Sequence, residues 1–587
     1  MKSIIQKTWK WVVTLLFGVV VALFWGQYYP AHLAYQEQSQ LFLFDKAYCL
    51  ETLSVPGGLA YYVSEFLAQF FGMAWVGAAI VALLFMALQR MLWQLMKRQS
   101  VSDAYYPFSF LPILLIWAFL GDENAMFAFP VSLLIALVAA WGYTCFSTRK
   151  QSAVYALIVL PLLYWAAGSA HFVFVGWVMM RELQRALSQG KLLGGLCFMA
   201  CVALYGLLAP LAASTFVQYS LERLMGSIHY YRFAEMPSLV VVTMLTTAFL
   251  PYLLSLLPNV KKGKILLQLS SLLVIFGGGF FLVKSACNMQ IEDALQYDQF
   301  IRNREWHSVL EKAEQADELL SFSQVCVNLA LAKTGRLSDY LFKYPQAGVE
   351  GLVPSFQRDF ITMMPVSEVY YHLGLINTAQ RFTFEAMEAI PNFRKSVRCI
   401  KRLAETNLLN GDYEVAAKYL KLLQKTLFYK EWATETMGYL YNEQRIANNR
   451  EYGWLRKVRI DDDFLFGDTK LDMVLAILFQ KNVQNTLAYE YLMAYVLLKR
   501  DVEGFSKYYA LGERAGYNRI PHSYQEALAY VWMQQYGNVN GLAGSIAPDV
   551  LHEVTDFMNI YRGDKSSQSM LASLYGDTFW YYLYYNN

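Results

Sequence analysis

Long apolar stretches separated by short polar segments fill the first half of the chain. They run near residues 11–29, 73–93, 108–121, 125–146, 153–167, 169–180, 192–212, 238–257 and 265–283. A helix of about 20 apolar residues crosses the hydrocarbon core of a bilayer, so the pattern predicts about nine spans over residues 1–286. The region 153–180 is open to two interpretations, as two short helices or as one long helix kinked around Pro161 and Gly168.

The second half has the apolar periodicity of amphipathic helices and few strand signals. Within it, Gly374, Ile376 and Ala379 recur 37 residues later as Gly411, Tyr413 and Ala416. This spacing resembles the tetratricopeptide pattern, in which a turn glycine precedes a small residue at the crossing of two helices. The alternative is a set of antiparallel helices without a repeat function. We therefore expect an all-α protein, with a transmembrane helix bundle over 1–286 and a tetratricopeptide-like soluble domain of helical hairpins over 287–587.

The charges follow the same division. Residues 1–286 hold 18 Lys and Arg against 10 Asp and Glu, whereas residues 287–587 hold 31 against 36. With the N-terminus inside, 14 of the 18 basic residues of the first half fall in inner loops, as the positive-inside rule requires. We expect a multi-pass protein of the bacterial inner membrane, with a cytoplasmic N-terminus and a periplasmic C-terminal domain. No basic cluster is long enough to indicate nucleic-acid binding.

Familiar catalytic motifs are missing from the sequence. It contains no P-loop, no G-x-S-x-G, no H-E-x-x-H and no G-x-G-x-x-G, so a self-powered transporter has no support. The seven cysteines form no C-x-x-C and indicate neither a zinc site nor a disulfide framework.

The candidate chemistry is concentrated in the predicted outer loops. Glu37 and Asp45 lie in the first loop and Asp122 and Glu123 in the second, while the third, QYSLERLMGSIHYYRFAEMP, contains His229 and Arg232. Within residues 44–72, the Pro-Gly-Gly at 56–58 predicts a break where the loop re-enters a helix. Glu65 and Gln69 follow one helical turn apart and share a face. The plainer interpretation is that these carboxylates are solvated loop residues.

This layout resembles the GT-C superfamily of lipid-linked glycosyltransferases. An inner N-terminus, acidic first and second outer loops, many spans and an outer C-terminal domain carry the resemblance. It implies catalytic roles for Asp45, or Glu37 in its place, and for Asp122 and Glu123. Apart from the resemblance, Glu37, Glu65, Gln69, His229 and Arg232 are the candidate substrate contacts, because polar residues beside a helix bundle can line a cavity. The resemblance also implies a polyprenyl-phosphate-linked sugar as substrate and a divalent metal ion as cofactor. The chain further resembles uncharacterised multi-pass bacterial envelope proteins with repeat-containing tails, chiefly through the QLFLF…PGGLAYYVSEFLAQFF region.

The main alternative is a non-enzymatic, membrane-anchored scaffold. Stacked helical hairpins form extended concave surfaces, and these would recruit envelope partner proteins while the spans contact the lipid bilayer. The third hypothesis is a channel or a secondary transporter. Transporters usually show paired charges deep within their spans, and this sequence has few.

Overall fold

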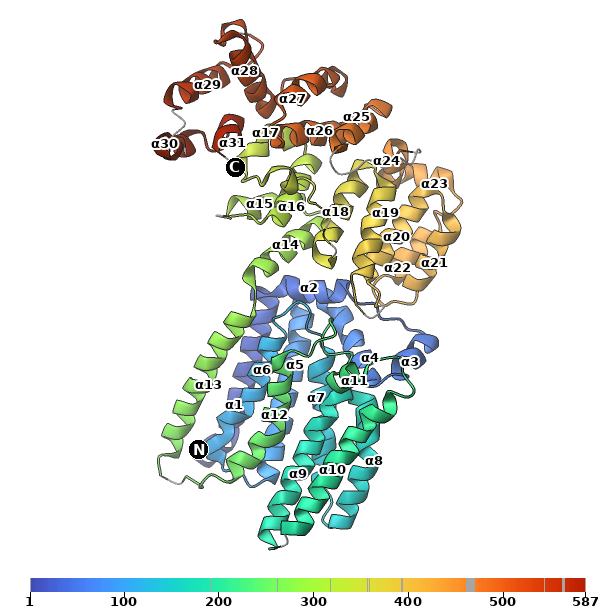
Figure 1. The fold of residues 1–587 in the computed structure, drawn as a ribbon, viewed down its shortest axis with the longest axis vertical. Coiled ribbons are helices and arrows are strands. Elements are labelled where there is room, and N and C mark those ends of the chain that lie inside the picture. The colour runs from blue at the N-terminus through green and yellow to red at the C-terminus, as the bar shows by residue number, and fades with distance from the viewer. Residues whose placement is uncertain are drawn as a thin grey trace. The chain divides into compact units, whose positions relative to one another are not determined.

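The computed structural model describes the chain except residues 1, 191, 261, 317, 356, 358, 392–393, 461–469, 543, 562–564 and 586–587. The described residues form helices and a single isolated bridge, between Ala125 and Tyr231 (Figure 1). The prediction of an all-α protein is thus confirmed.

The helices of the first half begin with α1 (Lys2–Leu23), which continues into a short π-helical turn, η1 (Phe24–Tyr28). The others are α2 (Pro30–Gln38), α3 (Lys46–Leu53), α4 (Gly58–Ala68), α5 (Ala74–Arg98), α6 (Leu111–Phe119), α7 (Ala128–Thr144), α8 (Arg149–Ala167), α9 (His171–Ser188), α10 (Leu192–Ala213), α11 (Leu221–Gly226), α12 (Ser238–Ser255) and α13 (Lys264–Ala286). Short 3-10 segments are η2 (Gln69–Gly72), η3 (Asp103–Phe110) and η4 (Gly168–Ala170).

The helices of the second half are shorter. They are α14 (Met289–Asn303), α15 (Trp306–Glu314), α16 (Ser321–Lys333), α17 (Leu337–Tyr340), α18 (Phe360–Leu373), α19 (Ile376–Glu388), α20 (Val397–Asn410), α21 (Tyr413–Leu423), α22 (Lys430–Met437), α23 (Glu443–Asn448), α24 (Arg450–Val458), α25 (Leu471–Lys481), α26 (Thr486–Leu498), α27 (Val502–Tyr509), α28 (His522–Tyr536), α29 (Pro548–Ile560), α30 (Lys565–Tyr575) and α31 (Phe579–Tyr585). The remaining 3-10 segments are η5 (Leu341–Lys343), η6 (Gly348–Gly351), η8 (Ala510–Ala515) and η9 (Asn540–Leu542).

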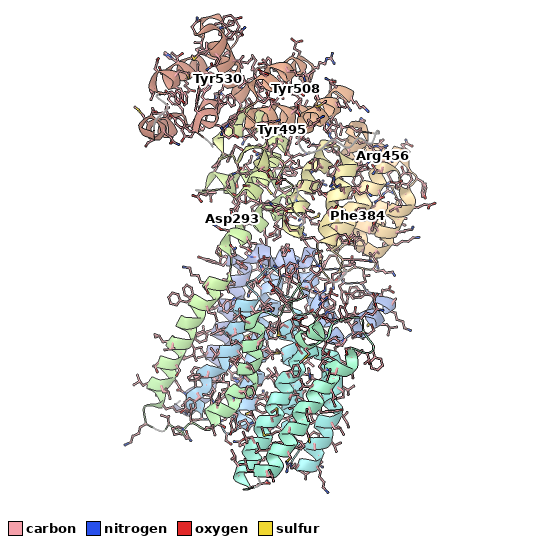
Figure 2. All side chains as sticks on the ribbon, in the orientation of Figure 1. Asp293, Phe384, Arg456, Tyr495, Tyr508 and Tyr530 are labelled. Carbon is pink, nitrogen blue, oxygen red and sulfur yellow. The ribbon has the colours of Figure 1, made fainter. Side chains whose placement is uncertain are left out.

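The chain folds into two compact units. The first comprises residues 1–292 together with two segments from the second half, 390–397 and 422–431. The second begins at Asp293, labelled in Figure 2, and comprises 293–389, 398–421 and 432–587. The predicted boundary at residue 286 did not anticipate that segments around 390 and 422 pack with the N-terminal half.

Six helical segments of the first unit are long and apolar enough to cross a membrane. They are Thr8–Tyr28, Ala74–Arg98, Arg149–Ser188, Leu192–Ala213, Ser238–Ser255 and Lys264–Ala286. These segments indicate a multi-pass membrane protein. Asp103–Phe119 and Ala128–Thr144 are apolar but shorter.

The segment Arg149–Ser188 reverses direction at η4. Arg149, at the start of α8, forms an ion pair with Glu182 near the end of α9, with 3.1 Å between Nε and Oε2. Each arm is therefore a separate helix of 18 or 19 residues, about 28 Å long at 1.5 Å per residue. Figure 1 shows α8, α9 and α10 side by side. Of the two interpretations of 153–180, the structure favours two helices.

Small residues let the apolar helices of this unit approach closely. A Cβ atom at Gly279 of α13 would lie 2.6 Å from Leu114 of α6, and one at Gly206 of α10 would lie 2.8 Å from Val175 of α9. Helices in membranes pack through such small residues because lipid provides no hydrophobic force to join them.

The second unit contains pairs of adjoining helices, several of them linked by a residue at positive φ. Gly374 (φ 89°) ends α18 before α19, and Gly411 (φ 88°) separates α20 from α21. Ala379 and Ala416, in the second helix of each pair, are both fully buried. The glycines and alanines recognised in the sequence thus occupy equivalent places in two helical hairpins, whereas their assignment to the tetratricopeptide family stays a prediction.

Candidate functional site

Three short helices, α2, α3 and α4, connect the first two apolar helices of the first unit. The backbone N–H groups of Ala31 and His32 in the first turn of α2 donate to the Glu292 carboxylate, at 2.7 and 2.8 Å. A carboxylate suits this place because a helix N-terminus carries unpaired donors and a partial positive charge.

The Pro-Gly-Gly sequence ends the first-loop segment and starts α4 at Gly58, as predicted. Gly57 has φ 81°, and a Cβ atom there would lie 3.4 Å from the Gly168 backbone in η4. Its own N–H donates to the carbonyl of Trp165 at 2.8 Å. Glycine at this position therefore lets the first loop lie directly against the turn of the α8–α9 hairpin, which fixes the start of α4.

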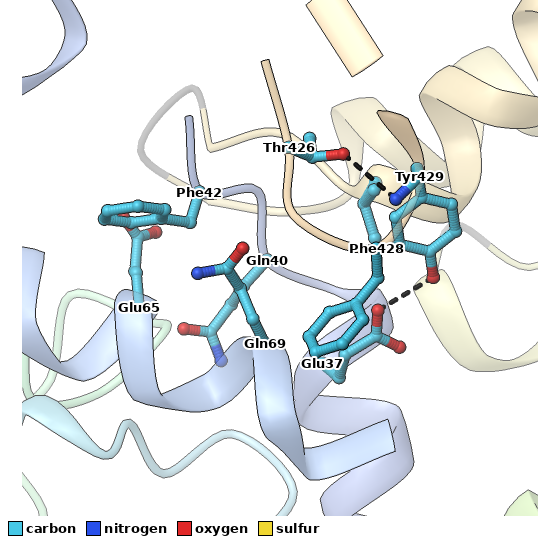
Figure 3. A pocket seen from close by; sticks show the side chains of 9 residues that line it. Glu37, Gln40, Phe42, Glu65, Gln69, Thr426, Phe428 and Tyr429 are labelled. Carbon is cyan, nitrogen blue, oxygen red and sulfur yellow. Dashed lines mark hydrogen bonds between the residues drawn. The ribbon is translucent and has the colours of Figure 1, made fainter. Parts of the chain in front are cut away.

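Three of the predicted substrate-contacting residues line one pocket. Glu37 from α2, Glu65 from α4 and Gln69 from η2 surround it, together with Gln40, Phe42, Val397, Thr426, Phe428 and Tyr429. Figure 3 shows Glu65 beside Phe42, and Glu37 beside Phe428 and Tyr429. Tyr429 donates to Glu37 Oε1 at 2.8 Å. The pocket measures about 20 Å³, which is room for one water molecule.

Glu65 is the most perturbed carboxyl group at this pocket. It is buried, and Tyr48 of α3 donates a hydrogen bond to its Oε2. Burial raises the pKa of Glu65 to about 7, while hydrogen bonds from Tyr48 and Tyr61 and the charge of Arg394 partly oppose that rise. A carboxyl group with a pKa near neutrality can give or take a proton at physiological pH, which a solvated loop carboxylate cannot do efficiently.

His229 and Arg394 continue this cluster on the other side of Tyr61. The His229 ring stacks on that of Tyr61 with centroids 4.3 Å apart, and the Arg394 guanidinium lies 4.7 Å from the same Tyr61 ring centroid. Arg394 Nη2 also donates to the Ile228 carbonyl at 2.8 Å. His229 Nε2 and Arg394 Nη1 are buried and have no hydrogen-bond partner among the described residues. Both groups can donate a hydrogen bond, and they belong to the same cluster as Glu65, whose pKa is raised.

Arg232 forms hydrogen bonds with a different set of residues. It donates to Tyr35 Oη at 2.9 Å, to Gln36 Oε1 at 3.2 Å and to Ser39 Oγ. Gln36 in turn donates to the backbone carbonyl of Glu123 at 2.8 Å. Arg232 thus joins the loop between α11 and α12 to α2 and, through Gln36, to the loop between α6 and α7. It does not line the pocket of Figure 3.

The three residues predicted to be catalytic lie in loop contacts and do not line this pocket. Asp45 Oδ2 accepts from Lys425 at 2.9 Å, and this contact lowers the pKa of the Asp45 carboxyl. Asp122 accepts from Tyr231 Oη at 2.9 Å and from the Asn124 backbone at 2.8 Å. Glu123 accepts from the Asn124 side chain at 3.2 Å, and burial raises the pKa of Glu123. Catalytic roles for these three residues stay predictions.

The donor set does not fit a divalent metal ion held by protein ligands alone. Within the described ranges, no three His, Cys, Asp or Glu side chains gather as a metal site. Glu37 and Glu65 are the two carboxylates at the pocket, and both accept hydrogen bonds from tyrosines.

Several residues of this site carry no signal in the sequence. Arg394, Lys425 and Tyr429 come from the two segments of the second half that belong to the first unit. They are ordinary charged and aromatic residues of inter-helix loops, and they follow Asp45 by more than 340 positions. Tyr61 precedes Glu65 by one helical turn in α4, and this spacing is a clue in the sequence, whereas Tyr48 lies in α3 and gives none.

Comparison with known proteins gives a family without an assigned activity. No curated protein and no solved structure matches the chain. A family described as "Family of unknown function (DUF6057)" matches residues 5–586, which is nearly the whole chain. The chain belongs to this family of unknown function, DUF6057.

Proposed function

We propose that the chain is a GT-C-like glycosyltransferase of the bacterial inner membrane that acts on a polyprenyl-phosphate-linked sugar during assembly of an envelope polysaccharide. The observation that supports this best is the gathering of Glu37, Glu65 and Gln69 at one pocket beside the donors Arg394 and His229. All of these residues belong to the first unit, which contains the apolar helices.

Glu65 is assigned the role of general base. With a pKa of about 7 it can accept the proton of an acceptor hydroxyl while that oxygen forms the new bond to the sugar C1. The bond between C1 and the phosphate oxygen breaks, and the polyprenyl phosphate leaves with the electron pair. Arg394 Nη1 and the His229 Nε2–H would donate to the leaving phosphate, where charge-assisted hydrogen bonds are strongest. We assign no step to a metal ion.

Substrate binding requires the pocket to open. Its volume of about 20 Å³ accommodates a water molecule and not a sugar. The wall formed by Thr426, Phe428 and Tyr429 meets the first-loop helices through the Tyr429–Glu37 hydrogen bond and the edge-to-face contact between Phe428 and Phe70. Separation of this wall from α2 and η2, which breaks these contacts, is the expected opening motion.

The proposed topology has the N-terminus in the cytoplasm and the second unit in the periplasm. It needs nine crossings, so both arms of the α8–α9 hairpin and the two shorter apolar helices must all span. A reporter that is active only outside the cytoplasm, fused after residue 300 or after residue 587, tests this. Activity of both fusions supports the topology, and silence of both contradicts it.

Surface glycans test the proposed activity in cells. A strain lacking the gene would be complemented with the wild type, with Glu65→Gln, or with Glu235→Gln, which alters an exposed glutamate of the third outer loop. We expect Glu65→Gln to reproduce the glycan profile of the deletion strain and Glu235→Gln to restore that of the wild type, at equal amounts of protein in the membrane. A wild-type profile with Glu65→Gln would overturn the proposal.

A scaffold is the second candidate function. The paired helices around Gly374 and Gly411 support it, since stacked hairpins form binding surfaces for other proteins. Its test is affinity capture of the full chain from cross-linked cells. Recovery of one stoichiometric envelope protein, with surface glycans unchanged by Glu65→Gln, would favour the scaffold over the enzyme.

A further inference from the structure

The second unit contains a cavity of about 930 Å³. Residues of α14, α15, α16, α18, α20, α22 and α24 line it, all within the second unit. Its volume lies in the upper part of the range found for small-molecule sites, which are concave and few in a protein. The proposed glycosyltransferase chemistry does not use this cavity.

The charge of the lining is positive because its two carboxylates are already paired. Glu451 accepts from Arg304 Nη2 at 2.6 Å, and Glu405 forms an ion pair with Arg402 at 2.9 Å. Lys333 and Arg450 also line the cavity, are exposed to solvent, and form no hydrogen bond or ion pair with the described residues. Both cations can attract an anion, although the charge of Glu451 also acts on Lys333.

Three indole rings line the cavity together with these cations. Trp306, Trp432 and Trp454 all line it, and Trp454 is 38% exposed. The ammonium group of Lys401 lies 4.9 Å from the Trp432 ring centroid, which holds a cation and an aromatic face together. An accessible indole offers a broad flat face on which a ring can pack.

The walls of the cavity are held in place by buried contacts. Tyr371 donates to Glu451 Oε1 at 3.0 Å, and the Arg402 guanidinium lies 3.7 Å from the Tyr371 ring centroid. Asn449 caps α24 by accepting from the backbone N–H of Glu451 and of Tyr452, at 3.0 and 2.9 Å. The helices that carry the lining are therefore held in place before a ligand binds, which reduces the entropy lost on binding.

We propose that this cavity binds an acidic oligosaccharide. The CH-bearing face of a pyranose ring packs on an indole, the hydroxyls find donors and acceptors in the polar lining, and a carboxylate or phosphate substituent pairs with Lys333 and Arg450. A nucleic acid is a poorer fit, since residues 287–587 hold 36 acidic against 31 basic side chains and would repel a polyanion outside the cavity.

Binding to the purified full chain in detergent tests this assignment. The probes are a tetrasaccharide of galacturonic acid, a heparin tetrasaccharide, and a neutral galactose tetrasaccharide of the same length, each titrated by calorimetry. We expect at least one acidic probe to bind about tenfold or more tightly than the neutral one, with affinity falling as salt rises. Trp454→Ala and Lys333→Ala should each weaken binding about tenfold.

A matched variant controls for general effects of charge. Lys418 is an exposed lysine of α21 that does not line the cavity, so Lys418→Ala should bind as the wild type does. Absence of binding by both acidic probes, equal binding of the neutral probe, or binding that Trp454→Ala and Lys333→Ala leave unchanged would each overturn the proposal. Binding of an acidic peptide in place of the saccharides would overturn it too. None of these outcomes depends on Glu65, so this test is independent of the glycosyltransferase proposal.

Discussion

Arg394 Nη2 lies 3.2 Å from Nδ1 of His229. A guanidinium group only donates, so Nδ1 must be the acceptor, and the ring is the neutral tautomer with its proton on Nε2. Burial, followed by the charge of Arg394, holds the pKa of His229 well below its usual value. The same arginine stabilises the ionised form of Glu65. One cation therefore lowers the pKa of both titratable groups, adding to the larger effect of burial at His229 and opposing it at Glu65.

Replacing Glu65 should change how stability depends on pH. Its pKa is about 7 in the folded state against 4.5 for a solvated glutamate, so the native state binds the extra proton between these pH values. The contribution of Glu65 to the free energy of unfolding is fully present below pH 4.5. It is lost as pH rises to about 7, a decrease of about 3 kcal/mol. Melting temperatures in detergent should show Glu65→Gln gaining on the wild type as pH rises through this window. A constant difference from pH 4.5 to 8 would contradict the assignment.

The contribution of His229 to stability should depend on pH with the opposite sign to that of Glu65. Its pKa is lowered by folding, so the unfolded chain takes up a proton below pH 6.5 that the native state refuses. This group therefore lowers wild-type stability as pH falls. The melting temperature of His229→Gln, relative to the wild type, should be higher at pH 5 than at pH 7.5. If the difference between the two proteins were the same at both pH values, His229 would not be the neutral buried ring described above.

Removing Arg394 should raise the pKa of Glu65 further, because the arginine charge favours the carboxylate. The pH at which the Glu65 contribution disappears should then move upward in Arg394→Ala. Lys395→Ala is the control, since Lys395 is the exposed neighbour of Arg394 and contacts none of the clustered groups. The measurement is the same series of melting curves. An identical shift in both variants would show only a general effect of net charge.

Alanine substitutions at two hairpin glycines measure the cost of backbone strain apart from the cost of a close packing contact. Gly374 and Gly411 have φ of 89° and 88°, so alanine at either position should cost about 1 kcal/mol for the left-handed backbone. A Cβ atom at Gly374 would also lie 3.0 Å from Val458 Cγ2 and 3.1 Å from its carbonyl oxygen. A Cβ atom at Gly411 would have no neighbouring atom of the described residues within 4 Å. Gly374→Ala should therefore lower the free energy of unfolding more than Gly411→Ala does. Chemical denaturation of the two variants measures the difference, and equal losses would contradict this contact.

Most of what could be predicted came from patterns among residues that are close in the sequence. Apolar length gave the helices of the first unit, Pro-Gly-Gly gave the start of α4, and helical spacing placed Glu65 and Gln69 on one face that proved to line a pocket. The spacing of Gly374 and Gly411 gave two hairpin turns.

Contacts between distant segments could not be predicted in this way. Arg394, Lys425 and Tyr429 reach the first loop from positions with no motif, and only tertiary packing brings them there. The partners of Asp45 and Asp122 were hidden for the same reason: a loop carboxylate looks equally solvated or catalytic until Lys425 or Tyr231 is seen beside it. Hydropathy also left open the reversal at Gly168–Ala170, because the arms of the hairpin are separated by a single short turn.

Transfer by the purified protein tests the central claim most directly. Detergent-solubilised wild type and Glu65→Gln, matched for melting temperature at pH 7.5, would be incubated with polyprenyl-phosphate-linked hexoses and membranes from the deletion strain as acceptor. Release of free polyprenyl phosphate would be followed by mass spectrometry. We predict release by the wild type, rising with pH through about 7 as Glu65 loses its proton, and release at background level by Glu65→Gln. Equal release by both proteins, or none by the wild type with any hexose, would contradict the account.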